Sequence, residues 1–540
     1  MNQRGLKISR STLGNALVLL ALMALAGWSL FLHGADAFAP TPMLQPRWMA
    51  ALATALWLGQ CGLMLADGRR HRAAADPSIA DWLVIHASQT GFGYELAQRT
   101  LDSLQRSGHT AALHDIASLD ADGLHGRNCL FIASTTGEGD PPDGALAFSH
   151  TTMAATFDLH DCRYAILALG DRNYAQFCAF GQRLDAWLRG NAARPLFDRV
   201  DVDNADHDAL QLWQQRLGSI ICQTDDCEIS IIPQFERWIL TQRQLLNPDS
   251  PGWPAFHLEL VPSHAAVLNW QAGDIVEVVP RNPEEAVSAF LAATGLSGTE
   301  PVSIHGQSMP LSDALARSHL PLVDTVRGSG ADTLATALRP LPHRDYSIAS
   351  LPSEGKLELL VRLMCNADGT HGICSSWLCG RAALGTQLDV RIRSNPGFHA
   401  PDPSRPMILV GNGTGIAGLR AHLKARIAEG AHRNWLLFGE RSAAHDDFFG
   451  DELERWLQTG GLEHLDRTFS RDGGTLRYVQ DALSTHAPRL RQWLDAGASL
   501  YVCGSAQGMA PAVDALLVDL LGTTAVNALI HEGRYRRDVY

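Results

Sequence analysis

Three short apolar segments, each followed by a loop rich in serine, threonine, glycine or aspartate, limit the fold of this chain most strongly. The segments are Trp82–His86, Cys129–Ala133 and Tyr164–Leu169. Apolar runs of this length are typical of buried strands, and a helical pattern follows the first loop to about Arg106. This alternation predicts a doubly wound α/β sheet, whose loops meet outside the carboxyl ends of the strands and bind a ligand there.

The loops have the composition of a phosphate site. They cover Ser88–Glu95, Ser134–Pro142 and Gly170–Tyr174. Backbone N–H groups at the start of a helix attract an anion, and hydroxyl side chains add donors. One such loop is weak evidence, but the three together resemble the flavodoxin family, and specifically the FMN module of diflavin reductases. The segment Ala168–Leu188 is also similar to the flavoprotein subunit of sulfite reductase.

This resemblance implies an FMN site whose residues are carried over by position. The phosphate would be held by Ser88, Gln89, Thr90, Gly91 and Gly93. One side of the ring would be lined by Thr135, Thr136, Gly137 and Gly139, and Tyr174 would stack on the flavin. The cofactor-binding residues implied in the third loop also include Gly170, Asp171 and Asn173. The alternative for Tyr174 is an ordinary buried tyrosine. Some relatives have an aromatic residue at the position of Thr136, so we expect one flavin face to be more open here.

Residues 235–400 have the pattern of an antiparallel β-barrel. Phe256–Val261 and Asp274–Val279 alternate as half-buried strands do, and the pattern turns helical between about 283 and 338. Residues 344–350 resemble the Arg-x-Tyr-Ser signature of the ferredoxin–NADP reductase family, and residues 371–377 match a second segment of that family. The second segment would form a tight turn at a helix start, with N–H groups facing a pyrophosphate.

The same resemblance implies an FAD site. Arg344 would pair with the FAD diphosphate as a fork, Tyr346 would flank the isoalloxazine, and Ser347 would hydrogen-bond near flavin N5. The turn residues that would approach the pyrophosphate are Gly372, Ile373, Cys374 and Ser375. The last residue, Tyr540, would stack on the FAD ring, so the nicotinamide would have to displace it before hydride transfer.

Residues 401–540 carry the pattern of a second nucleotide-binding fold. A strand enters a glycine turn in Met407–Gly415, which is weak evidence alone, but later strand ends complete a resemblance to the NADP module of the same family. The residues implied for NADPH are Gly413, Thr414, Ser470, Arg471, Arg477, Tyr478 and Gln480. In that family a Ser-Arg…Tyr…Gln group recognises the 2′-phosphate. Relatives usually have lysine where Leu476 stands and proline where Gly418 stands; Arg477 is the adjacent cation here.

A serine, a cysteine and an aspartate would surround the nicotinamide in this family. Here they are Ser347, Cys503 and Asp538, and with Tyr540 they form the predicted catalytic set. Cys503 is not expected to act as a nucleophile; it would pack beside the reacting atoms and help to hold donor and acceptor in line. Taken alone, Cys503 would be interpreted as a buried thiol at a strand end.

The N-terminal residues 1–75 predict a membrane hairpin and a tether. Ser11 to about Leu32 is long and apolar enough to cross a bilayer, and a second apolar run covers about Trp48 to Leu65. Basic residues flank both runs, so the positive-inside rule places the catalytic domains in the cytoplasm, on two spans of the inner membrane. A cleaved signal peptide is the alternative for the first run alone. Only His33 lies near a span, so we expect an anchor without haem.

Charge and cysteine spacing exclude several classes of protein. The net charge of -13 argues against nucleic-acid binding. Residues 76–230 carry ten Lys/Arg against twenty-two Asp/Glu, which indicates either a solvated surface or a docking face for a basic redox partner. The cysteines lack zinc or iron–sulfur spacing, so no metal is predicted. The closest pairs, Cys222/Cys227 and Cys374/Cys379, are expected to be ordinary thiols.

The order of these segments predicts a membrane-anchored diflavin oxidoreductase with an FMN domain at 80–222, an FAD barrel at 235–400 and an NADP domain at 401–540. It would take a hydride from NADPH to FAD and pass single electrons through FMN to a haem- or metal-containing acceptor protein in or at the membrane. Three alternatives remain. They are a sulfite reductase-type flavoprotein subunit, an electron donor to a membrane ferric or haem reduction system, and a non-catalytic flavin-binding scaffold or sensor, which would need a broken hydride site.

Overall fold

The computed structural model describes residues 80–88, 91–172, 174–203, 206–221, 234–264, 266–304, 307–366 and 368–540. The chain divides into two compact units, Met1–Arg72 and Ala73–Tyr540, and every described element belongs to the second. The expected membrane hairpin lies outside the described residues. Among the residues described, no single helix is long and apolar enough to cross a membrane, whereas the bent pair α16 (Met509–Leu521) and α17 (Thr523–His531) passes by length and composition.

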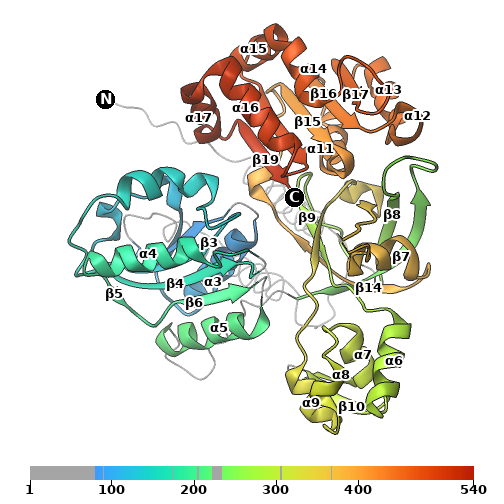
Figure 1. The fold of residues 1–540 in the computed structure, drawn as a ribbon. Helices are drawn as coiled ribbons and strands as arrows, with labels where there is room; N and C mark the ends of the chain where they lie inside the picture. The colour runs from blue at the N-terminus through green and yellow to red at the C-terminus, as the bar shows by residue number, and fades with distance from the viewer. Residues whose placement is uncertain are drawn as a thin grey trace, which may run out of the picture. The chain divides into compact units, whose positions relative to one another are not determined.

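The first module is a parallel sheet flanked by helices (Figure 1). Its strands follow the order β2-β1-β3-β4-β5, with β6 paired to β4. The strands are β1 (Trp82–Ala87), β2 (Ala111–Asp115), β3 (Asn128–Ser134), β4 (Arg163–Gly170), β5 (Arg194–Pro195) and β6 (Val200–Asp203). The main helices are α3 (Phe92–Arg106), α4 (Ala179–Gly190) and α5 (His207–Ile221). The predicted doubly wound sheet is therefore confirmed.

This sheet forms because its central strands are apolar on both faces. Leu83 and Ile85 of β1 pack with Phe131 in one core, whereas Val84 and Ile132 pack in the other core with α3 and α5. Each fully buried side chain of this size contributes about 1.5–3 kcal/mol. Because β1, β3 and β4 are neighbours in the sheet, the three predicted ligand loops emerge at one edge.

The second module is an antiparallel sheet of six strands in the order β12-β9-β14-β7-β8-β13. The strands are β7 (Glu236–Leu245), β8 (Ala255–Pro262), β9 (Ile275–Val278), β12 (Arg344–Ser347), β13 (Leu357–Arg362) and β14 (Gln387–Arg393). A bridge between Ile348 and Leu359 joins the two ends of this order. The two strand patterns predicted from alternating residues appear as β8 and β9.

The insert between β9 and β12 is helical only in part. Its helices are α6 (Glu284–Thr294), α7 (Leu311–Ala316), α8 (Val323–Val326) and α9 (Ala331–Ala337), drawn yellow-green in Figure 1, and they share a small apolar core. Between α6 and α7, the strands β10 (Pro301–Ile304) and β11 (Gln307–Pro310) form a hairpin that the helical expectation omitted. Buried Val302 alternates with exposed Ser303, and the flanking prolines disfavour helix.

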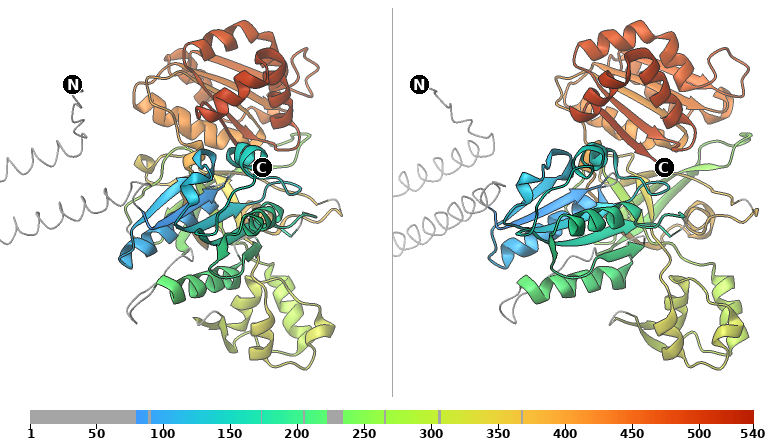
Figure 2. Two further views of the ribbon diagram at one scale, coloured as in Figure 1. Left: turned by 90° about the vertical axis from the view of Figure 1, so that its left-hand side faces the viewer. Right: turned by 60° about the vertical axis from the view of Figure 1, so that its left-hand side comes forward.

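The third module is a five-stranded parallel sheet in the order β17-β16-β15-β18-β19. The strands are β15 (Met407–Asn412), β16 (Asn434–Glu440), β17 (His464–Phe469), β18 (Ser499–Gly504) and β19 (Tyr535–Val539). Ile408 and Val410 face a core with α14 (Val479–Thr485) and α16, and Met407 and Leu409 face a core with α11 (Ile416–Ala428) and α13 (Gly450–Gln458). Both views in Figure 2 show helices on either side of this orange-to-red sheet.

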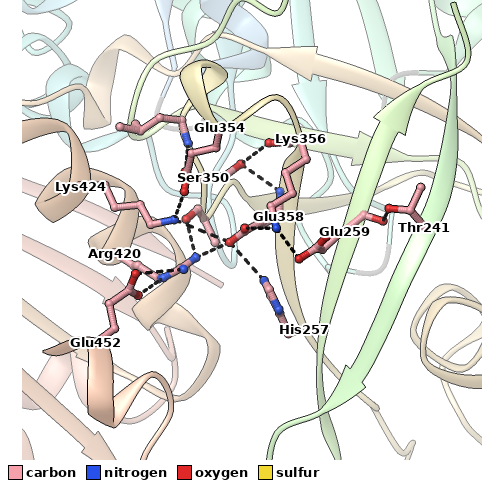
Figure 3. A network of polar contacts seen from close by, with 12 residues as sticks. Thr241, His257, Glu259, Ser350, Glu354, Lys356, Glu358, Arg420, Lys424 and Glu452 are labelled. Carbon is pink, nitrogen blue, oxygen red and sulfur yellow. Dashed lines mark hydrogen bonds and ion pairs between the residues drawn. The ribbon is translucent and has the colours of Figure 1, made fainter. Parts of the chain in front are cut away.

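A buried ion-pair network joins the barrel to this third module (Figure 3). At its centre Glu358 of β13 contacts His257 Nε2 of β8 at 3.2 Å and accepts a hydrogen bond from Arg420 of α11 at 2.5 Å. Arg420 also donates to Glu452 of α13 at 2.5 Å and to the carbonyl oxygen of Ala349 at 3.0 Å. The side chains of Glu358 and Arg420 are only 4% and 9% exposed, so each charge depends on the other.

The network sets the protonation state of Glu358. Burial by itself raises the pKa of a carboxyl group. The hydrogen bonds from His257 and Arg420, together with the charges of Arg420 and Lys424, outweigh burial and hold the pKa of Glu358 well below its usual range. Glu358 is therefore ionised at neutral pH, and its negative charge is balanced by Arg420 and by Lys356, whose Nζ lies 3.1 Å from Glu358 Oε1.

Arg420→Met is expected to destabilise the protein by about 1–3 kcal/mol, because it removes the charge-assisted hydrogen bonds to the buried Glu358 carboxylate and to Glu452. The measurement is the midpoint of urea unfolding. Glu463→Gln is the control, because it breaks the ion pair between Glu463 and Arg433. Their side chains are 43% and 52% exposed, and an exposed ion pair contributes less than about 1 kcal/mol to stability. Equal midpoints for the two variants would contradict the role given to the network.

Candidate active site

The predicted FMN phosphate loop lies at the carboxyl end of β1. Gly91 precedes α3 with φ +63°, a left-handed conformation that favours glycine. The Ser88 hydroxyl is buried and has no hydrogen-bond partner among the described residues. A side chain at Gly93 would begin 2.9 Å from Ser88 Cβ, so glycine keeps the space beside that hydroxyl open. A buried serine hydroxyl in a glycine cradle fits a phosphate; Gln89 and Thr90 lie outside the described residues.

The second FMN loop follows β3. The backbone N–H of Thr135 donates to Leu169 at 2.8 Å, and its hydroxyl accepts from the N–H of Phe180 at 3.2 Å. The Thr136 hydroxyl donates to the carbonyl oxygen of Asp140 at 3.2 Å. The threonine hydroxyls therefore hold the loop in shape. Two glycines with left-handed backbone, at φ +49° and +108°, complete the turn: Gly137 and Gly139.

The third FMN loop follows β4 and carries Gly170, Asp171 and Tyr174. The backbone N–H of Tyr174 donates to Asp171 at 3.2 Å, and 47% of Tyr174 is exposed. An ordinary buried tyrosine does not have this exposure, so the ring is accessible to a flavin at the edge where the loops meet. The stacking role stays a prediction, and Asn173 lies outside the described residues.

The predicted FAD residues come together at β12 and α10 (Ile373–Ser376). The Tyr346 hydroxyl donates to Cys374 Sγ at 3.4 Å and so joins the strand to the turn. The Ser375 hydroxyl donates to the Gly372 carbonyl oxygen at 3.2 Å, which shapes the turn. Arg344 is exposed, and its Nη1 donates to the carbonyl oxygens of His343 at 3.0 Å and Pro342 at 3.3 Å.

A cavity of about 520 Å³ lies at this turn. The residues that line it include Pro254, Phe256, His371, Ile373, Ser376 and Arg381. The Arg381 guanidinium donates to the Ser376 hydroxyl at 2.7 Å and to the Ile373 carbonyl oxygen at 3.1 Å. The volume is that of a ligand pocket, and Ile373 of the predicted FAD turn lies in its wall.

The predicted hydride site is assembled from three separate elements. Ser347 ends β12, and Cys503 and Asp538 are register partners on β18 and β19. The Ser347 hydroxyl donates to Asp538 Oδ2 at 2.8 Å, and Cys503 Sγ lies 3.8 Å from the same oxygen. Burial, and then the Asp538 charge, raise the pKa of the Cys503 thiol well above its usual range. The thiol is therefore neutral, as the non-nucleophilic role requires.

Close backbone approach brings the glycine turn to this site. A side chain at Gly415 would begin 2.2 Å from the carbonyl oxygen of Cys503, so only glycine fits there. A side chain at Gly418 would begin 3.3 Å from Ser347 Cβ and 3.6 Å from Cys503 Sγ, so the residue that replaces the usual proline lies at the hydride site. Thr414 Oγ1 lies 3.3 Å from the hydroxyl oxygen of Tyr540, which places the last residue over the same turn.

The predicted 2′-phosphate residues also gather in one place. Ser470 follows β17, and its backbone N–H donates to the carbonyl oxygen of Glu440 at 2.9 Å. Arg477 donates to the Ser470 carbonyl oxygen through Nε at 3.3 Å and Nη2 at 3.1 Å, and its guanidinium lies 5.7 Å from the Tyr478 ring. Gln480 lies in the first turn of α14, and Arg471 directly follows Ser470. Arg477 thus brings a cation to the group that lacks the usual lysine.

The charged residues that pair across modules were not predicted from the sequence. Arg362 of β13 pairs with Glu440 of β16. Arg391 of β14 donates to Glu277 at 2.5 Å and also pairs with Glu95, in the first turn of α3. The available signal was a charged residue within or at the end of an otherwise apolar strand, but the sequence does not name the partner.

Two groups of side chains have ligand-type atoms within 4.8 Å of one another: His257 with Glu259 and Glu358, and Glu277 with His343 and Asp345. Both groups already hold cationic side chains. Lys356 bonds Glu259 at 2.5 Å, and Arg393 bonds Glu277 at 2.7 Å. These acids are therefore balanced by the protein itself, and the absence of a metal stays a prediction.

Comparison with known proteins identifies two of the modules. The flavodoxin family matches residues 84–213, and the oxidoreductase NAD-binding domain family matches residues 409–515. The flavoprotein alpha-component of sulfite reductase [NADPH] from Vibrio cholerae is 30% identical, over 85% of this chain and 87% of its own length. The same component from Yersinia enterocolitica is 30% identical over 93% and 96%, and that from Cronobacter sakazakii is 29% identical over 92% and 95%.

Arg477→Ala is expected to lower the ratio of kcat/KM for NADPH to that for NADH by about tenfold or more, because a charge-assisted hydrogen bond to the 2′-phosphate is lost. Arg477→Lys, which keeps the charge, should retain most of the ratio. Adding Leu476→Lys to Arg477→Ala should restore part of it. The ratio is measured by steady-state kinetics with both nucleotides. If Arg477→Ala leaves it unchanged, Arg477 does not bind the 2′-phosphate.

Proposed function

The chain belongs to the family of NADPH-dependent diflavin reductases, and on this premise we propose that it is a membrane-anchored member serving a haem- or metal-containing acceptor protein. The observation that carries the reductase activity in this proposal is the convergence of Ser347, Cys503 and Asp538 from three elements. When bound, FAD accepts a hydride from NADPH and FMN passes electrons singly to an acceptor.

The protein's own contribution at this site is alignment. Asp538 accepts the Ser347 hydrogen bond and thereby fixes the direction of the hydroxyl. Cys503 is fully buried and neutral, so it would present an apolar surface beside the reacting atoms. Holding donor and acceptor in one geometry removes an entropic part of the barrier. An intact set of these three groups argues against a non-catalytic scaffold or sensor.

A haemoprotein acceptor is supported by the relatives, which are flavoprotein components of sulfite reductase. The membrane location is supported by the two apolar runs and basic flanks of residues 1–75. The acidity of residues 76–230 suits docking of a basic partner. A sulfite reductase-type subunit is the second candidate, because the likeness to those relatives covers most of both chains.

Gly93→Val is expected to remove FMN while leaving FAD, because the new side chain fills the space beside the Ser88 hydroxyl. The wild-type chain should hold about one FMN and one FAD and reduce both ferricyanide and cytochrome c with NADPH. The variant should keep ferricyanide reduction and lose most cytochrome c reduction. Gly190→Ala in the same module is the control, since nothing lies within 4 Å of its added carbon. If the wild-type protein binds both flavins but reduces neither acceptor, the proposed reductase activity is wrong.

The anchor is tested by fractionation of cells that express the full chain. We expect the protein in the membrane fraction after a high-salt wash, because two apolar spans hold it by burial and not by charge. A chain that begins at Ala73 is the comparison and should be released. If the full chain is also released by salt, the membrane-anchored proposal fails and the sulfite reductase-type candidate is favoured.

The acceptor would be identified by a second experiment, in which the full chain captures a haemoprotein from detergent-solubilised membranes.

A further inference from the structure

An ion pair lies against the glycine turn of the nucleotide-binding module. The turn, residues 411–415, contains no Lys or Arg. Arg362 at the end of β13 pairs through Nη2 with Oε1 of Glu440 at the end of β16. A side chain at Gly413 would begin 3.6 Å from that carboxylate oxygen and 3.8 Å from that nitrogen. The nucleotide turn therefore meets a cation that comes from the barrel, not from its own module.

The Arg362 guanidinium is held in place from several sides. Its Nη1 donates to the carbonyl oxygen of Trp253 at 3.2 Å, and its central carbon lies 5.7 Å from the Phe448 ring. The side chains of Arg362 and Glu440 are 14% and 4% exposed. Burial raises the pKa of Glu440, and the Arg362 charge opposes that rise. The cation is thus fixed before any ligand arrives, so little side-chain entropy is lost when one binds.

The charge of Glu440 makes Arg362 necessary at this place. Backbone N–H groups at the turn and at the start of α11 favour an anion such as a diphosphate. A buried carboxylate this close to the turn would repel that anion unless a cation stood beside it. The guanidinium has five N–H donors in a planar fork. The Glu440 carboxylate and the Trp253 carbonyl oxygen do not use all five, and the geometry of the fork suits phosphate oxygens.

We propose that Arg362 is a positioning residue for the diphosphate of NADPH and that Glu440 fixes its guanidinium beside the glycine turn. The inference rests on the proposed function, because it needs the nucleotide to bind at this turn. It also links the two modules, since the barrel would supply the cation for the nucleotide carried by the third module. The alternative is that Arg362 and Glu440 form a structural ion pair that connects the modules and does not contact the nucleotide.

The test compares two ligands by calorimetry on the full chain with its flavins. NADP⁺ carries the diphosphate, whereas adenosine 2′-monophosphate reaches only the 2′-phosphate group of Ser470, Arg471 and Arg477. Arg362→Ala is expected to weaken NADP⁺ binding by about tenfold or more and to leave adenosine 2′-monophosphate binding within about twofold. Arg362→Lys should lose less, because it keeps the charge but not the fork.

Glu440→Gln is the matched variant of opposite sign. It removes a negative charge near the diphosphate, so its affinity for NADP⁺ should equal or exceed that of the wild type. The double variant Arg362→Ala with Glu440→Gln should recover part of the NADP⁺ affinity that Arg362→Ala loses. If Arg362→Ala weakens the binding of both ligands equally, Arg362 only connects the two modules. If it weakens the binding of neither ligand, Arg362 has no role in binding. Either result overturns the inference. If the wild type binds neither ligand, the proposed function itself fails.

Discussion

The buried ion pair between Glu358 and Arg420, together with an apolar core that both modules share, joins the barrel to the nucleotide module. Arg420 also donates to the carbonyl oxygen of Ala349, two residues beyond Ser347. Gly418, two residues before Arg420 on α11, lies against Ser347 and Cys503. The pair therefore helps to set how close the helix comes to the strand at the site where hydride transfer needs alignment.

Glutamate–arginine pairs lie at the contacts between modules. Glu358 with Arg420 and Glu440 with Arg362 join the barrel to the nucleotide module, and Arg391, which pairs with Glu277 inside the barrel, also contacts Glu95 of the first module. The attraction within such a pair is largely offset by the cost of removing both charges from water. The planar donor fork of arginine nevertheless accepts a narrow range of directions. These contacts therefore specify the geometry between modules more than they add to stability.

Much of the fold followed from local patterns. The strands β1, β3, β4, β8 and β9 were predicted from short apolar or alternating runs, and the glycine turns from their residue types, because both depend on neighbours in sequence. The hairpin β10–β11 was missed because its strands are only four residues each inside a helical pattern. Arg477 was foreseen as a displaced cation, and its hydrogen bonds to Ser470 show how it reaches the same group.

Local sequence patterns were enough to predict the three modules, the positions of the candidate ligand loops and the family, since strand period, glycine placement and motif spacing are properties of short segments. Which charges meet could be seen only in the folded chain. Glu358 and Arg420 are 62 residues apart, Arg362 and Glu440 are 78 apart, and Glu95 and Arg391 are 296 apart. No local pattern selects such partners, because the energy of a buried charge depends on what the fold brings beside it.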